Sequence, residues 1–124
     1  MLVSAPISVG ELVDKITILE IKLDRINDAG KLTNIALELG HLSEILKSLD
    51  LKDTEALLRA DLKAINSELW DIENFKRLCE TTQDFGPQFI EAARNVYLKN
   101  DQRAALKRAI NILAGSTIIE EKSY

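Results

Sequence analysis

The sequence predicts an all-α protein, an antiparallel helical hairpin or bundle of about five helices with coiled-coil-like packing. Leu and Ile number 19 and 14 among the 124 residues, whereas aromatic residues make up only 5%. Apolar residues recur at alternating spacings of three and four along most of the chain, which is the period of a helix face. Pro and Gly, which interrupt helices, number only 2 and 5. This length suits a single helical domain over residues 1–124.

The first helix is predicted to start at a capping box. Ser8 and Glu11 are three residues apart, so each side chain can bond a free backbone N–H of the first turn. The segment 28–30 predicts the end of this helix, with Gly30 suited to a left-handed C-cap. The apolar stripe between these signals comprises Leu12, Ile16, Leu19, Leu23 and Ile26.

Two further helices follow in the same style. The second carries the stripe Leu32, Ile35, Leu39, Leu42, Leu46 and Leu49, and the third carries Leu58, Leu62, Ile65, Leu69, Ile72 and Cys79. We expect the third helix to extend from about Asp53 to Thr81. Because the connections near Gly30 and at 50–53 are short, consecutive helices should be antiparallel neighbours.

The last third of the chain predicts two shorter helices and a tail. Pro87 is a suitable first helical residue, and the pair Asn100-Asp101 indicates a stop followed by a new cap. A short fifth helix should then end at Gly115. Residues 116–124 form a C-terminal tail without periodicity, which either docks on the bundle or follows the usual disorder of chain ends.

Charge and cysteine content limit the classes of function. The net charge of −4 argues against nucleic acid as a partner, although the basic residues of 88–114 outnumber the acidic ones. Cys79 is the only cysteine, so no internal disulfide forms. No apolar run is long enough to span a membrane and residues 1–6 resemble no secretory signal, so the cytoplasm is the expected compartment.

Complete metal or catalytic sets are not found in the sequence. His41 is the only histidine, so the pair Glu38 and His41 cannot be duplicated as di-iron bundles require. Glu11 and Asp14 have the spacing of one magnesium-binding pair, but Glu11 is better explained by the capping box. Cys79 lies on an apolar stripe, where thiols are usually inert. We therefore expect no metal and no cofactor, and a non-enzymatic protein rather than an enzyme.

Polar residues that interrupt the apolar stripes form the candidate site. They comprise Glu20, Lys22 and Arg25 near the start of the chain and Arg94, Tyr97, Asn100, Asp101 and Arg103 near its end. Helical spacing places Asn100, Arg103, Lys107 and Asn111 on one face. Two interpretations stay open: an ion-pair network that ties the C-terminal helices to the first helix, or an Arg/Lys/Tyr pocket for a small anion.

The two ends of the chain resemble a family of small uncharacterised proteins from bacteria and their phages. The resemblance is carried by SVGELVDKITILEIK at residues 8–22, by RNVY at 94–97, by NDQRA at 100–104 and by EEKSY at 120–124. It implies an accessory role near glycosyltransferases and surface polysaccharide assembly. It implies no catalytic residues.

Two hypotheses about function follow. The first is a non-enzymatic accessory or interaction module that forms a homodimer and binds a protein partner. The second is an all-α small-anion binder or enzyme, by analogy with chorismate mutases, in which cationic side chains surround the ligand. The cationic wall would then consist of Lys22, Arg25, Arg94 and Arg103.

Overall fold

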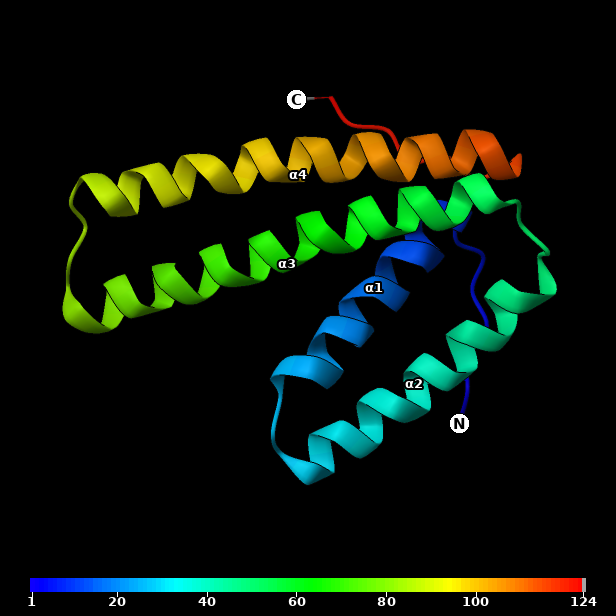
Figure 1. The fold of residues 1–124 in the computed structure, drawn as a ribbon, viewed down its shortest axis with the longest axis horizontal. Coiled ribbons are helices and arrows are strands. Elements are labelled where there is room, and N and C mark those ends of the chain that lie inside the picture. The colour runs from blue at the N-terminus through cyan, green and yellow to red at the C-terminus, as the bar shows by residue number, and fades with distance from the viewer. Residues whose placement is uncertain (124) are drawn as a thin grey trace.

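The computed structural model describes residues 1–123 and confirms the all-α fold. Its helices are α1 (Val9–Arg25), α2 (Ala29–Ser48), α3 (Asp53–Thr82) and α4 (Pro87–Ala114), and no strand occurs among the described residues. The short connections make successive helices antiparallel, as the sequence predicts (Figure 1).

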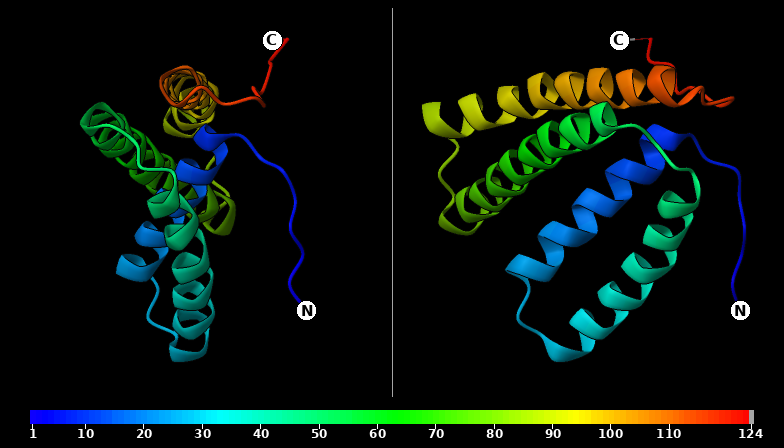
Figure 2. Two further views of the ribbon diagram at one scale, coloured as in Figure 1. Left: turned by 90° about the vertical axis from the view of Figure 1, so that its right-hand side faces the viewer. Right: turned by 45° about the vertical axis from the view of Figure 1, so that its right-hand side comes forward.

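The helices form two hairpins that diverge from a shared end. Helices α3 and α4 lie side by side, and the α1–α2 hairpin projects from one end of this pair (Figures 1 and 2). Helix α1 packs against all three other helices, whereas α2 packs against α1 alone. The second half of α3 and the first half of α4 therefore extend past α1 as a two-helix arm.

The core lies where α1, α3 and α4 meet. Val13, Leu62 and Ile110, one from each of these helices, are fully buried against one another. They are flanked by the partly buried apolar side chains of Val9, Leu46, Leu58 and Leu106. A core of this size fixes the crossing of the helices but leaves the arm outside it.

Residues 1–123 form four helices rather than the predicted five, because α4 continues through Asn100 and Asp101. Neither residue caps a helix. Asn100 accepts a hydrogen bond from Arg103, and Asp101 pairs with Lys122. Asn and Asp reduce helix stability by only about 0.7 kcal/mol each relative to Ala, and residues 88–114 contain no Pro or Gly. The stop predicted at this pair was therefore wrong.

The helix termini confirm some sequence signals and correct one. Ser8 caps α1 by accepting a hydrogen bond from the Glu11 N–H at 3.1 Å, and Gly115 ends α4 at φ 66°. The prediction that Gly30 ends the first helix was wrong. Helix α1 ends at Arg25, and Asp28 caps α2 by accepting from the Lys31 N–H at 2.9 Å. Gly30 therefore lies in the first turn of α2.

Candidate functional site

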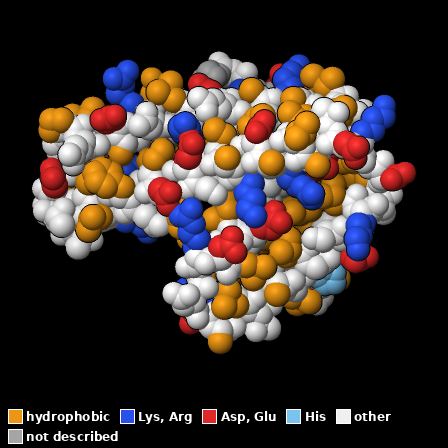
Figure 3. Space-filling model, in the orientation of Figure 1, with side chains coloured by type: hydrophobic (Ala, Val, Ile, Leu, Met, Phe, Trp, Pro, Cys, Tyr) orange, Lys and Arg blue, Asp and Glu red, His pale blue; other side chains and the backbone are white. Residues whose placement is uncertain are grey.

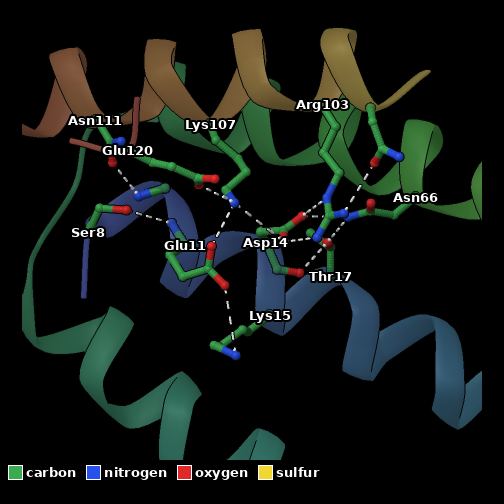
Figure 4. A network of polar contacts seen from close by, with 12 residues as sticks. Ser8, Glu11, Asp14, Lys15, Thr17, Asn66, Arg103, Lys107, Asn111 and Glu120 are labelled. Atoms are coloured by element: carbon green, nitrogen blue, oxygen red, sulfur yellow. Dashed lines mark hydrogen bonds and ion pairs between the residues drawn. The ribbon is translucent and has the colours of Figure 1, made fainter. Parts of the chain in front are cut away.

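A buried carboxylate lies at the centre of the polar residues. Asp14 of α1 is 0% exposed. The guanidinium of Arg103 on α4 binds both of its oxygens, with Nε 2.9 Å from Oδ1 and Nη2 2.5 Å from Oδ2 (Figure 4). Asn66 of α3 donates a third hydrogen bond to Oδ1 at 2.9 Å. Because a buried charge is costly unless it is paired and hydrogen-bonded, this bidentate arrangement allows Asp14 to remain ionised inside the protein.

Thr17 extends the cluster by one turn of α1. Its hydroxyl donates to the backbone carbonyl of Asp14 at 2.8 Å and accepts from Asn66 Nδ2 at 2.9 Å. Thr17 is itself fully buried. The spacing of three between Asp14 and Thr17 places both on the face of α1 that α3 and α4 cover. Three helices are thus joined by one set of buried hydrogen bonds.

Lys107 forms the second half of the cluster, one turn along α4 from Arg103. Its ammonium Nζ lies 2.6 Å from Glu11 Oε2 and 3.0 Å from Glu120 Oε2, and it lies 4.0 Å from Asp14 Oδ2. Lys107 is buried. One ammonium therefore joins two carboxylates of α1 to a carboxylate of the C-terminal tail (Figure 4).

Helices α1 and α4 cross so closely that backbone N–H groups of α1 donate to side chains at the end of the chain. The Gly10 N–H donates to Asn111 Oδ1 at 2.6 Å, and the Val9 N–H donates to Ser116 Oγ at 3.3 Å. These N–H groups belong to the first turn of α1, where no carbonyl of the helix can accept from them. Asn111 and Ser116 therefore act as caps supplied from the far end of the chain.

The pairing changes the pKa values of the three central groups. Burial favours the neutral form of Asp14, but hydrogen bonds from Arg103 and Asn66 and the charges of Arg103 and Lys107 outweigh it, so the Asp14 pKa falls below 3.8. The hydrogen bond to Asp14 raises the pKa of Arg103. Burial opposes the charge of Lys107, but hydrogen bonds to Glu11 and Glu120 raise its pKa above 10.5. All three groups are charged at neutral pH.

The tail docks on the bundle, one of the two outcomes that the sequence leaves open. Besides the pair between Glu120 and Lys107, Glu121 lies 3.2 Å from Arg108 and Lys122 lies 3.6 Å from Asp101. The tail thus runs back along α4, as Figure 2 shows. The predicted tail ends at Tyr124, which lies outside the described residues.

A pocket of about 710 Å³ opens between α4 and the tail. Four of the predicted site residues, Tyr97, Asn100, Asp101 and Arg103, line it. Lys107, Glu120 and Lys122 add further charges, and Val96 and Ala104 add an apolar surface. The structure therefore brings half of the predicted residues to one place.

The other predicted site residues lie elsewhere. Arg25 forms an ion pair with Asp71 of α3, and Glu20 lies 3.9 Å from Lys63. Arg94 lines a separate shallow hollow on α4, and Lys22 forms no ion pair within residues 1–123. The four cations Lys22, Arg25, Arg94 and Arg103 are therefore not gathered around one ligand position.

The residue at the centre of the cluster, Asp14, is not among the predicted site residues. Its spacing from Glu11 suggests half of a metal-binding pair, yet the two carboxylates face Arg103 and Lys107 instead. The available signal was an Asp inside an apolar stripe together with basic residues on one face of a second helix. No sequence signal points to Asn66, and Glu120 stands out only as part of the tail motif EEKSY.

Residues 1–123 thus form a small four-helix fold with a partly buried ion network, which comprises Glu11, Asp14, Arg103, Lys107 and Glu120, where α1, α4 and the tail meet. The chain belongs to DUF6165, a family of unknown function that matches it over residues 3–124. No curated protein and no solved structure matches the chain.

Within residues 1–123, no group of three or more His, Cys, Asp or Glu side chains is placed to hold a metal ion. None of the helices in this part of the chain combines the length and apolar character needed to cross a bilayer.

Proposed function

We propose that this protein is a non-enzymatic accessory or interaction module that works as a homodimer in the cytoplasm. The observation that carries the proposal is the arm face, which we define as Leu78, Phe85, Ile90 and Leu98. These side chains are 57%, 44%, 56% and 42% exposed. Figure 3 shows hydrophobic side chains gathered at the free end of α3 and α4.

Two antiparallel helices bury only part of their apolar surface against each other. The arms of two copies packed together would form a four-helix arrangement, which covers an apolar stripe on each helix. The ion network and the arm have different roles in this proposal. Its charges compensate one another inside one chain, so it holds the crossing of the helices and leaves the arm to make external contacts.

The charges beside the arm face are self-complementary. Glu91 and Arg94 lie between Ile90 and Leu98 on one exposed surface of α4, and Arg94 forms no ion pair among the described residues. A twofold axis places the same patch opposite itself. Arg94 of one copy can then pair with the partner's Glu91, and the partner's Arg94 with Glu91 of the first.

Light scattering of purified protein is expected to show a dimer. Ile90→Lys should give a monomer, whereas Leu37→Lys, at an exposed position of α2, should leave the dimer intact. Arg94→Glu should weaken the dimer by about tenfold through repulsion from Glu91, and the double variant Glu91→Arg/Arg94→Glu should restore it. A wild-type monomer, or a dimer that Ile90→Lys leaves unchanged, would contradict the proposal.

The accessory role that the family resemblance implies belongs to the same proposal. Support comes from the exposed apolar side chains of the arm face, since a module without its own reaction would act by binding other proteins. Surface polysaccharide assembly is the process that the resemblance suggests. Cells that carry Ile90→Lys should show a changed surface polysaccharide profile on a gel, and cells that carry Leu37→Lys should not.

The pocket beside the tail favours a second candidate function, the binding of a small anion. Lys107 and Arg103 line it together with the hydroxyl-bearing Tyr97. The Glu120 carboxylate, which is 58% exposed, already lies on Lys107. Exchanging this carboxylate for a free anion leaves the charge of the cluster unchanged, so the tail marks where an anion would bind.

Inorganic phosphate tests this second candidate. Removing the competing charge by Glu120→Gln should let phosphate raise the Tm by about 5 °C at about ten times its Kd. Chloride at the same ionic strength should not do so. Glu121→Gln is the matched control, because Glu121 pairs with Arg108 outside the pocket. Equal effects of phosphate and chloride on the Glu120→Gln variant would exclude the anion site.

A further inference from the structure

A second hollow, a mostly apolar groove of about 330 Å³, lies between α1 and α3. Ile18 and Ile21 of α1 and Leu69 and Trp70 of α3 provide its apolar lining. Helices α1 and α3 diverge toward the C-terminal end of α1 (Figure 1), and Ile18, Leu69 and Trp70 are only partly buried. The volume is that of a small-molecule site, since such sites begin at about 300 Å³.

The groove also contains a few polar groups, which is typical of ligand sites. Asn66 lines the groove, and its amide nitrogen donates to Asp14 and Thr17. Its carbonyl oxygen accepts no hydrogen bond within residues 1–123. Arg103 reaches the groove, but its charge is already matched by Asp14.

Arg77 is a cation of the groove that has no counter-charge among the described residues. It lines the groove from α3 and is exposed, and its guanidinium forms no ion pair or hydrogen bond with any described residue. The acidic neighbour Glu73 is paired with Lys76 at 3.4 Å. The guanidinium of Arg77 is thus available to an anion at the edge of an apolar surface.

We propose that this groove binds a small organic anion with an apolar ring. The ring lies against Trp70 and Ile18, and the anionic group, a sulfonate, phosphate or carboxylate, binds the Arg77 guanidinium. Asn66 Oδ1 accepts a hydrogen bond from a donor on the ring, which adds selectivity. The volume of the groove accommodates one ring system rather than a helix or an extended peptide.

This site is independent of the proposed dimer, because the groove shares no residue with the arm face. A monomeric protein could therefore bind the ligand, and a dimer could form without it. The groove shares only Arg103 with the pocket beside the tail. Failure of one proposal consequently leaves the others intact.

Titration of the protein with naphthalenesulfonate tests the site. Trp70 is the only tryptophan, so its indole N–H gives a single resonance in a proton–nitrogen correlation spectrum. That resonance should shift in a saturable, one-to-one manner. Arg77→Gln should weaken binding by about tenfold, the usual effect of losing one charge-assisted hydrogen bond.

Lys31→Gln is the control, because the Lys31 ammonium is also exposed and forms no ion pair among the described residues, and Lys31 lies on α2 outside the groove and the arm face. It should leave the affinity unchanged. Naphthalenemethanol, which has the same ring without the charge, should bind more weakly and should not respond to Arg77→Gln. An unshifted Trp70 resonance, or equal weakening by Arg77→Gln and Lys31→Gln, would overturn the proposal.

Discussion

Replacing Asp14 with Ala is expected to lower the free energy of unfolding by about 3–5 kcal/mol, because it leaves the partly buried guanidinium of Arg103 without its counter-charge. Asn66 loses a hydrogen-bond acceptor in the same step. Small domains are stable by only about 5–15 kcal/mol in total. The variant should therefore unfold at a much lower urea concentration in a titration followed by circular dichroism.

Two further variants separate this effect from a general loss of charge. Asp71→Ala removes the partner of Arg25 in an exposed ion pair and should cost less than about 1 kcal/mol. The double variant Asp14→Leu/Arg103→Met replaces the pair with apolar side chains and should recover much of the loss. If Asp14→Ala and Asp71→Ala have equal effects, the Asp14 cluster does not hold the fold.

The pH dependence of stability provides a second measure of the same contact. The folded-state pKa of Asp14 lies below its ordinary value of 3.8. Its contribution is therefore complete above pH 3.8 and is lost as the pH falls through the folded-state pKa. Asp14→Asn, which keeps the shape but cannot ionise, should be less stable than wild type at neutral pH. The difference between the two should shrink in acid, and a constant difference would contradict the assignment.

Periodicity predicted the faces of the helices correctly but not their partners. Asn100, Arg103, Lys107 and Asn111 were placed on one face, and the last three make the contacts of α4 with α1. Residue spacing along α4 is enough to predict which side chains share a face, because a shared face depends only on helix geometry. Which carboxylate meets each cation depends on where two helices cross, and a helical period does not specify that.

The crossing point explains why the charged residues predicted on the first helix lie elsewhere. Helix α1 meets α4 near its own first turn, at Gly10 and Asp14. The later residues Glu20 and Arg25 have by then diverged from α4 and pair with α3 instead. The close approach depends on the absence of a Cβ atom at Gly10, which lets the two helices meet at the start of α1.

Substituting Gly10 with Ala is accordingly expected to destabilise the protein strongly, by about 2–5 kcal/mol. A Cβ atom at this position would lie 2.8 Å from Asn111 Oδ1 and closer still to the backbone carbonyl oxygen of Lys107. A backbone atom of a packed helix cannot move aside as a flexible side chain can. Helix α1 must therefore shift away from α4, which breaks the hydrogen bond from Gly10 to Asn111 and lengthens the contact between Glu11 and Lys107.

Gly40→Ala makes the same chemical change at an exposed position and should raise the free energy of unfolding instead of lowering it. No atom lies within 4 Å of a Cβ built on Gly40, which is an exposed residue inside α2. Ala is favoured over Gly in a helix by about 1 kcal/mol, so this variant should be slightly more stable than wild type. Urea unfolding of both variants measures the contrast directly. Equal stability of Gly10→Ala and wild type would show that α1 can move away from α4 without cost, and the close crossing would then not be what positions the ion network.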